Sequence, residues 1–297
     1  MITANQPSLR PVASPAANPS NKYMVLFLAI SFGTCYGIAS LFMFFPDFIV
    51  PITGELHLMH PLAIVALYSP SIAGLITCYL MGGKDALKGM FLKLVPRKKD
   101  LFWIPIIIGI SIVFASSMHF GSLLFGIPVP ELTYSVPEMI WLGILNLFKE
   151  TGLIGGLFGW IGFLLPFLQG KLKNNVASGL ITGFLFGLWV LPGYLISSFG
   201  TSTTYIYYVV QLMAFIVFQS YIFNATRGTL LFYLLAFWLV ATGSQIDLYY
   251  FNPQVQIMQF FFFVTSAIII HIVFKLKKVD TTLQTFPAYV LEWKEAK

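Results

Sequence analysis

Eight long apolar segments joined by short loops determine what this chain can fold into. They lie at 23–46, 62–82, 101–126, 136–168, 175–198, 203–223, 228–247 and 254–274. Each reaches the roughly 20 residues that an α-helix needs to cross a bilayer. Only 9% of the 297 residues are charged and 58% are hydrophobic, whereas soluble domains carry about 25% charged residues. The sequence therefore predicts an all-α, polytopic membrane helix bundle with about eight transmembrane helices.

The basic residues lie on alternate loops, and this pattern predicts the orientation. One side of the bundle carries Arg10, Lys22, Lys84, Lys88, Lys93, Arg97, Lys98, Lys99, Lys171, Lys173, Arg227, Lys275, Lys277, Lys278, Lys294 and Lys297. The loops on the other side carry no Lys or Arg. Because cytoplasmic loops are enriched in these residues, we expect a multi-pass protein of the plasma (inner) membrane with both termini cytoplasmic. The same asymmetry explains the net charge of +6. We therefore expect the lipid bilayer, and not nucleic acid, as the partner.

Composition also predicts the domain limits. Residues 1–22 are rich in Pro, Ser, Ala and Asn, which is typical of a disordered tail, here cytoplasmic. Residues 23–278 form the expected eight-helix membrane domain, and 279–297 a second cytoplasmic tail. Cys35 and Cys78 lie inside apolar segments and provide no disulfide framework. No motif for a metal ion or a bound phosphate is present, so we expect no metal and no cofactor.

The fourth segment is the most unusual, because Asn146, Lys149 and Glu150 lie in its middle. A charged residue at the centre of a membrane helix costs roughly 2.5–3.5 kcal/mol on insertion scales. Small residues follow at spacings of three and four, where another backbone can approach closely: Gly152, Gly155, Gly156, Gly159 and Gly162. We predict that the chain is organised around this segment. It is too long for one upright crossing, so it should tilt, bend or continue along the interface.

The polar residues of this segment allow two interpretations. Asn146 and Glu150 are one turn apart and can share a face, whereas Lys149 points about 100° away from Glu150. They are either a polar lock that fixes helix packing or a site that handles protons, water or substrate. His119, in the third segment, is likewise either a hydrogen-bonded packing residue or a ligand.

Four stretches of the chain resemble one family of membrane enzymes. They are YSPSIAGLITCYLMGGKDALKGMFLKLVPRKK at 68–99, GWIGFLLPFLQ at 159–169, ASGLITGFLFGLWVLP at 177–192 and NATRGTLLFYLLAFWLVA at 224–241. Together they resemble the CAAX protease and bacteriocin-processing (CPBP) family of intramembrane proteases over roughly 60–245. The resemblance implies an eight-helix fold that encloses a peptidase site, in which an acidic pair and histidines activate a water.

The polar positions of the family motifs are substituted in this chain. Where such proteins hold two glutamates, an arginine, two histidines and an Asn or Asp, this chain has Gly156, Leu157, Ile161, Val190, Phe237 and Ala241. Trp160 and Trp189 match the motifs. Hydrolysis of this type needs an acid or base beside the attacking water. The resemblance therefore implies that the scaffold is kept and the chemistry is not.

Three functions follow, and they leave open whether the chain is an enzyme. The first is a catalytically inactive homologue that binds or regulates a membrane protein, or a helical or lipid-modified peptide, in a groove supported by Asn146, Lys149, His119, Trp160 and Trp189. The second is an active endopeptidase that uses Glu150 on a lipid-modified or transmembrane peptide, as in bacteriocin maturation or self-immunity. The third is a small transporter that uses Lys149 and Glu150 as a relay.

Overall fold

The computed structural model describes residues 20–292 except 58–59, 150 and 197–202, and it describes no side chains at 147–152. The described part consists of helices and connecting segments and contains no strand. In chain order the helices are α1 (Asn21–Phe44), α2 (Pro46–Thr53), α3 (Pro61–Leu92), η1 (Lys98–Asp100), α4 (Trp103–Leu124), α5 (Val136–Lys149), α6 (Thr151–Gly156), η2 (Leu157–Leu164), α7 (Leu165–Leu172), α8 (Asn175–Ile196), α10 (Tyr205–Ala225), α11 (Leu230–Gln245), α12 (Pro253–Lys277) and α13 (Ala288–Leu291).

A helix lies in each of the eight expected segments. Seven helical spans among the described residues are long and apolar enough to cross a membrane. The exception is α11, which has 16 residues. At 1.5 Å per residue it is about 24 Å long, shorter than the roughly 30 Å hydrocarbon core. The chain is an integral membrane protein, with seven helices of membrane length and a shorter α11 packed among them.

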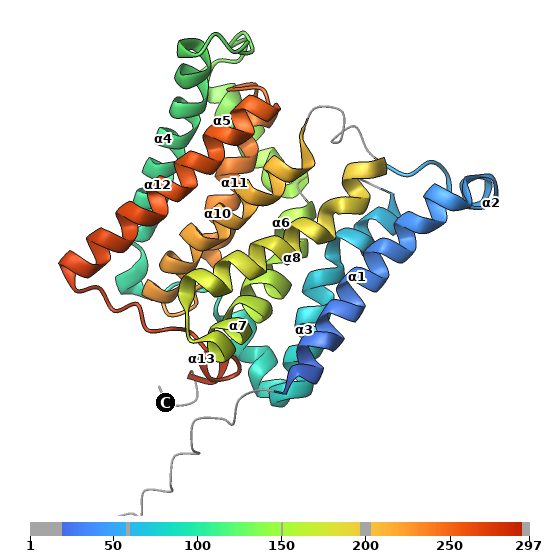
Figure 1. Cartoon of the computed structure of the whole chain (residues 1–297), viewed down its shortest axis with the longest axis vertical. Helices are drawn as coiled ribbons and strands as arrows, with labels where there is room; N and C mark the ends of the chain where they lie inside the picture. The colour runs from blue at the N-terminus through green and yellow to red at the C-terminus, as the bar shows by residue number, and fades with distance from the viewer. Residues whose placement is uncertain (1–19, 58–59, 150, 197–202, 293–297) are drawn as a thin grey trace, which may run out of the picture.

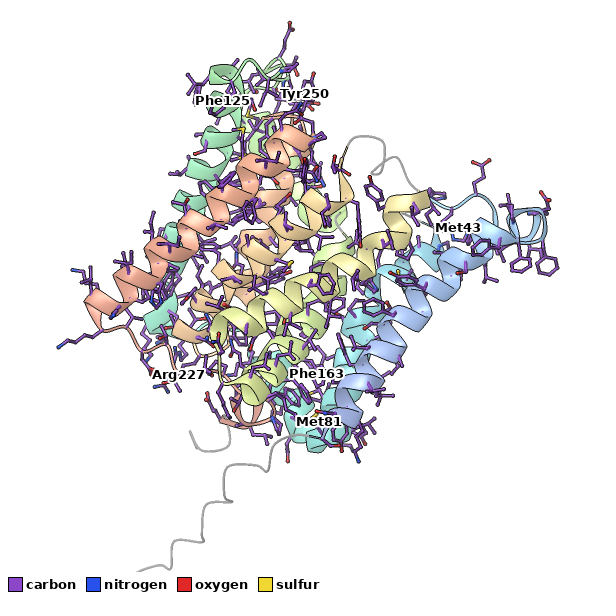
Figure 2. The ribbon with its side chains drawn as sticks, viewed as in Figure 1. Met43, Met81, Phe125, Phe163, Arg227 and Tyr250 are labelled. Carbon is purple, nitrogen blue, oxygen red and sulfur yellow. The ribbon has the colours of Figure 1, made fainter. Side chains whose placement is uncertain are left out.

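The helices form a bundle with two flanks. Helices α1 and α3 pack together on one flank, α4 and α12 lie on the opposite flank, and α8 and α10 lie between them (Figure 1). Figure 2 shows Met81 and Arg227 toward one end of the bundle and Phe125 and Tyr250 at the other. We call the end that contains Arg227 the basic end. The helix ends and loops that meet there carry Lys93, Arg97, Lys98, Lys99, Arg227 and Lys278.

The fourth segment is the core of the bundle, as predicted. In Leu153–Leu172, 94% of the membrane-length window is buried, compared with at most 67% in any other described span. The segment is not one regular helix, which agrees with the expectation that it could not be one upright crossing. Between α6 and α7 lies η2, a π-helix whose eight residues are all buried. Such π-helical turns are rare and frequently lie at functional sites.

A hydroxyl from α3 occupies the junction between α6 and η2. In a regular α-helix the Phe158 N–H would bond to the Ile154 carbonyl four residues earlier. Instead, Ser71 Oγ accepts from Phe158 N at 3.1 Å and donates to Ile154 O at 2.6 Å. A side chain inserted into the helical ladder is a known cause of a local bend. Contact with α3 therefore fixes the point at which the central segment leaves α-helical geometry.

The glycine face of the central segment packs against α3. A Cβ added to Gly155 would collide with the Leu67 carbonyl oxygen, and one added to Gly159 with the Pro70 carbonyl oxygen. This close approach of two backbones confirms the prediction from the glycine spacing. It also means that α3 already fills this face, so the face does not form part of an open groove.

The apolar part of helix α3 ends at Gly83. This residue has φ 65° and ψ −160°, a conformation that side chains with a Cβ rarely adopt, and the helix breaks there. The break follows directly on the predicted segment 62–82. Lys84 and Lys88 lie in the helical turns beyond it.

Residues 279–292 form a strap across the basic end; we call them the C-terminal strap. The sequence predicts only a cytoplasmic tail here, yet Tyr289 is 1% exposed. Pro166 has no N–H to offer the Gly162 carbonyl four residues before it, and the Tyr289 hydroxyl donates to this carbonyl. The Phe286 N–H donates to the Pro166 carbonyl at 3.2 Å. The described part of the expected tail is therefore packed against the bundle, because the central segment has carbonyls that need donors.

Candidate functional site

Trp160 lies where the central segment, α8 and α11 meet. Its indole is fully buried and stacks on Phe186 of α8, with ring centroids 5.2 Å apart and 12° between the planes. Trp189 lies 6.0 Å from Trp160, and Phe27 of α1 packs edge-on at 5.4 Å. Phe237 of α11 lies 6.4 Å from Phe186. We call these five side chains the Trp160 cluster, whose spacings are those of favourable aromatic pairs.

The substituted positions of the central segment border this cluster or the core beside it. Leu157 and Ile161 are 1% and 0% exposed. A Cβ added to Gly156 would lie 3.0 Å from Trp160 Cδ1 and 3.7 Å from Phe186 Cζ. An acidic side chain at position 156 would therefore require the stacked rings to move.

Two more substituted positions, Val190 and Ala241, lie beside the cluster on α8 and α11. Val190 follows Phe186 by four residues on α8, and Ala241 follows Phe237 by four on α11, so each lies one turn further along. Both are half-buried. The structure thus brings Gly156, Phe237 and the two tryptophans together, with Val190 and Ala241 one turn away.

The Trp160 cluster consists of phenylalanine and tryptophan side chains, and the indole nitrogen of Trp160 is its notable polar group. Among the described residues, the Trp160 indole nitrogen has no hydrogen-bond partner, although it is buried. A buried donor without an acceptor costs about 1–3 kcal/mol. A Cβ added to Gly156 would lie 3.6 Å from this nitrogen. The unpaired N–H therefore lies beside the position where the family resemblance implies a glutamate.

Polar groups next to the cluster bond to the backbone of α8. Pro192 lacks an N–H, which leaves the Leu188 carbonyl without its helical partner. The Tyr36 hydroxyl donates to this carbonyl at 2.6 Å, and Tyr205 donates to the Gly187 carbonyl at 3.0 Å. In a membrane such groups have to be satisfied within the protein. These tyrosines therefore tie α1 and α10 to α8.

Trp189 makes a second connection to a neighbouring helix. Its indole Nε1 donates to Ser69 Oγ at 3.3 Å, and Ser69 Oγ donates to the Ser31 carbonyl at 2.9 Å. This chain links α8, α3 and α1 in the buried core. The indole N–H of Trp189 is therefore used in packing.

Asn146 is buried and bonds α5 to α11. Its Nδ2 donates to Thr242 Oγ1 at 3.0 Å. One turn earlier, Trp238 Nε1 donates to the Gly143 carbonyl at 2.9 Å. For Asn146 this is the arrangement expected of a polar lock. The Lys149 side chain and the whole of Glu150 lie outside the described residues, so their roles remain predictions.

His119 has the contacts of a packing residue. Its Nδ1 lies 2.7 Å from the Leu248 carbonyl, which joins α4 to the segment between α11 and α12. A carbonyl accepts, so Nδ1 carries the proton. In the part of the chain that the structure describes, no three His, Cys, Asp or Glu side chains form a group that could hold a metal ion.

Several residues that organise this region were not predicted from the sequence. Ser71, Tyr36 and Tyr289 all bond to main-chain groups that the helices leave unpaired. For Tyr289 and Tyr36 the available signal was Pro166 and Pro192, two of the prolines inside the apolar segments. Each proline frees a carbonyl that needs a donor, although proline position does not say which residue supplies it.

The larger hollows in the described part lie away from the Trp160 cluster. One, of about 880 Å³, runs between α4 and α12. Another, of about 420 Å³, lies between α8, α10 and α12. No residue of the cluster lines either of them.

No family model and no curated protein matches this chain. The fold and the composition define its class as an integral membrane protein built as a polytopic helical bundle.

Proposed function

We propose that this chain is a catalytically inactive relative of the CPBP intramembrane proteases. It acts by binding a second membrane protein, or a helical or lipid-modified peptide. The observation that carries the proposal is the composition of the Trp160 cluster. Phe237 of the cluster and Gly156 beside it stand at positions where the resemblance implies a histidine and a glutamate.

The meeting of the motif segments supports the relationship. The resemblance rests on stretches separated by many residues, and a chance likeness does not require them to meet in space. Gly156 and Trp160 come from the central segment, Phe186 from α8 and Phe237 from α11, yet they form one continuous set of contacts.

The buried side chains support the loss of catalysis. General acid–base catalysis contributes about 10²- to 10⁴-fold to a rate, and it needs a titratable group within hydrogen-bond reach of the water. Leu157 and Ile161 are closed to solvent, and Phe237 packs between Phe186, Phe215 and Tyr233. The side chains at the substituted positions Leu157, Ile161 and Phe237 can neither accept nor donate a proton.

The outer helices support a binding role. Only 22% of the membrane-length window of α1 is buried within the chain. Helices in membranes associate through close van der Waals packing and interhelical hydrogen bonds. An outer face of this kind is available to a partner helix.

The test uses the protein in nanodiscs with a fluorescent, prenylated peptide. We expect saturable binding without cleavage, and the same result for Glu150→Gln. Glu138→Gln is the matched control, because Glu138 is an exposed acid on the same helical segment. Absence of saturable binding would contradict the binding role for lipid-modified peptides.

Two results would support the competing functions. Cleavage by the wild type that Glu150→Gln abolishes, with an unchanged melting temperature, would establish an active endopeptidase. Uptake of a solute driven by a pH gradient in sealed vesicles would establish a transporter. Either result would overturn the proposal.

A further inference from the structure

We propose that the hollow between α4 and α12, the α4–α12 groove, binds one anionic phospholipid. An acyl chain lies along the two helices, and the phosphate lies at the basic end. This inference does not depend on the proposed function, because the groove is separate from the Trp160 cluster.

The walls of the groove leave a channel between two points of contact. The helices touch at Trp103 and Phe274, with ring centroids 5.7 Å apart, and again at Phe114 and Phe262, at 5.2 Å. Between these contacts, Gly109 lines the groove, and a Cβ added there would meet nothing within 4 Å. The missing side chain of Gly109 therefore widens the groove at its middle.

The dimensions fit one acyl chain of one leaflet. From Trp103 to Val113, α4 rises about 15 Å at 1.5 Å per residue. This is half of a hydrocarbon core about 30 Å thick. Val113 is 58% exposed and Ile269 of α12 is 56% exposed, so the groove opens sideways toward the bilayer. A lipid can enter laterally without passing through the protein.

The mouth of the groove is basic. Arg97, Lys99 and Arg227 line it together with Asp100 and Asp280. Arg97 forms an ion pair with Asp100, which is itself buried, so these two charges offset each other. Arg227 forms a long, exposed ion pair with Asp280 at 3.9 Å, beyond hydrogen-bond length, so the carboxylate offsets part of its charge without binding its N–H groups. The lining therefore keeps a net charge of +1, and the Arg227 guanidinium and the exposed Lys99 can donate to a phosphate.

The charge selects the class of lipid. Guanidinium groups match the geometry of phosphate oxygens, and basic pockets between membrane helices bind anionic headgroups. A zwitterionic lipid brings no net charge to the net positive lining, and its choline cation is repelled by Lys99 and Arg227 but attracted by Asp280. The smaller hollow between α8, α10 and α12 has no Lys or Arg in its own lining. Lys275 and Lys278 line a separate hollow of about 310 Å³ that adjoins it, and that hollow has no arginine in its lining.

The experiment is native mass spectrometry of the delipidated full-length protein. Phosphatidylglycerol or phosphatidylcholine with identical chains is added in separate titrations. We expect one phosphatidylglycerol to bind more tightly than phosphatidylcholine. Each of Lys99→Gln and Arg227→Gln should lower the affinity for phosphatidylglycerol about fivefold. Gly109→Leu should reduce binding of both lipids, because the leucine fills the middle of the groove.

Matched controls separate the groove from general effects. Gly33→Leu makes the same change at an exposed helical glycine on α1, where a Cβ also meets nothing within 4 Å. Lys277→Gln removes an exposed charge at the basic end that does not line the groove. Both controls should bind phosphatidylglycerol like the wild type.

Three outcomes would overturn the proposal. Equal affinity for the two lipids would remove the headgroup site. Unchanged binding in Gly109→Leu would place the lipid elsewhere. Loss of a dimer, with lipid binding unchanged, in the Gly109→Leu spectra would make a second copy of the chain the occupant. If Gly109→Leu does not fold, the wild-type comparison of the two lipids still decides the first of these, and unchanged phosphatidylglycerol affinity in both charge variants would also overturn the headgroup site.

Discussion

At the scale of single residues, several hydroxyl groups in this bundle form hydrogen bonds with main-chain groups. Ser71 replaces a helical hydrogen bond at the start of η2, and Tyr36 and Tyr289 donate to carbonyls that prolines leave unpaired. Burial raises the pKa of the Tyr289 phenol well above its ordinary value, so it remains a proton donor at neutral pH. These three residues supply hydrogen bonds to irregular parts of the helices.

Replacing Ser71 by alanine should lower stability by about 1–3 kcal/mol, because it leaves both the Phe158 N–H and the Ile154 carbonyl without a partner. Thermal or SDS-induced unfolding in micelles measures the change. The control is Ser117→Ala, whose exposed hydroxyl bonds only within α4. Its effect should stay within about 0.5 kcal/mol. Equal effects of the two changes would show that the inserted hydroxyl has no special value.

Tyr36 and Pro192 should be energetically coupled. Tyr36→Phe alone removes the donor to the Leu188 carbonyl and should cost about 0.6–1.5 kcal/mol. Pro192→Ala supplies a main-chain N–H for the same carbonyl, so in that background Tyr36→Phe should cost much less. A double-mutant cycle measures the difference. Additive costs would mean that the tyrosine acts through packing alone.

At the scale of helices, the closest helix pairs are those that pack through glycines. Gly179, Gly183 and Gly187 recur every four residues on α8 and face α10. A Cβ added to Gly183 would lie 2.5 Å from the Cα of Met213. The two backbones therefore touch along a stripe with no room for a methyl group, as small-residue packing in membranes requires.

Alanine substitutions should have opposite signs at two glycines. Gly183→Ala must push α10 away from α8 and should cost about 1–3 kcal/mol. Gly33→Ala, on the exposed face of α1, meets no neighbour and should gain up to about 1 kcal/mol from the lower entropy of the unfolded chain. Unfolding curves of the two variants check the contrast. A stable Gly183→Ala variant would contradict the close α8–α10 packing.

The helices could be predicted from the sequence far better than their junctions. Hydropathy located all eight segments, because each must bury or expose a continuous apolar surface. It did not reveal that α11 is short, or that the fourth segment contains a π-helix. The start of the π-helix is bonded to Ser71, which lies 87 residues before Phe158 in the chain. A contact between residues so far apart cannot be predicted from composition or hydropathy. The motif positions of the Trp160 cluster could be named, but not their ring stacking.

At the scale of the whole molecule, the charge pattern predicts the orientation in the membrane. The described basic segments meet at one end. The exposed residues Lys98, in η1, and Glu131, in the loop after α4, lie on either side of α4. Because α4 has the length of a membrane crossing, these two loops should face opposite compartments. The positive-inside rule assigns Lys98 to the cytoplasm.

Cysteine labelling tests this orientation. A membrane-impermeant maleimide added to right-side-out vesicles should label Glu131→Cys at once and Lys98→Cys only after permeabilisation. Cys35 and Cys78 are free but buried, so the wild type should give little background. The reverse pattern would invert the predicted topology, and labelling of both without permeabilisation would remove α4 as a crossing.

The C-terminal strap also has a consequence for biosynthesis. The ribosome makes the central segment more than a hundred residues before Tyr289, the donor to its Gly162 carbonyl. All eight apolar segments have been synthesised before that tyrosine exists. The last contacts of the core therefore form after the membrane helices have been made, and a chain interrupted between Lys277 and Tyr289 would carry α1 to α12 but lack the strap at the basic end. Such a product offers a cellular quality-control protease a site that the finished protein closes.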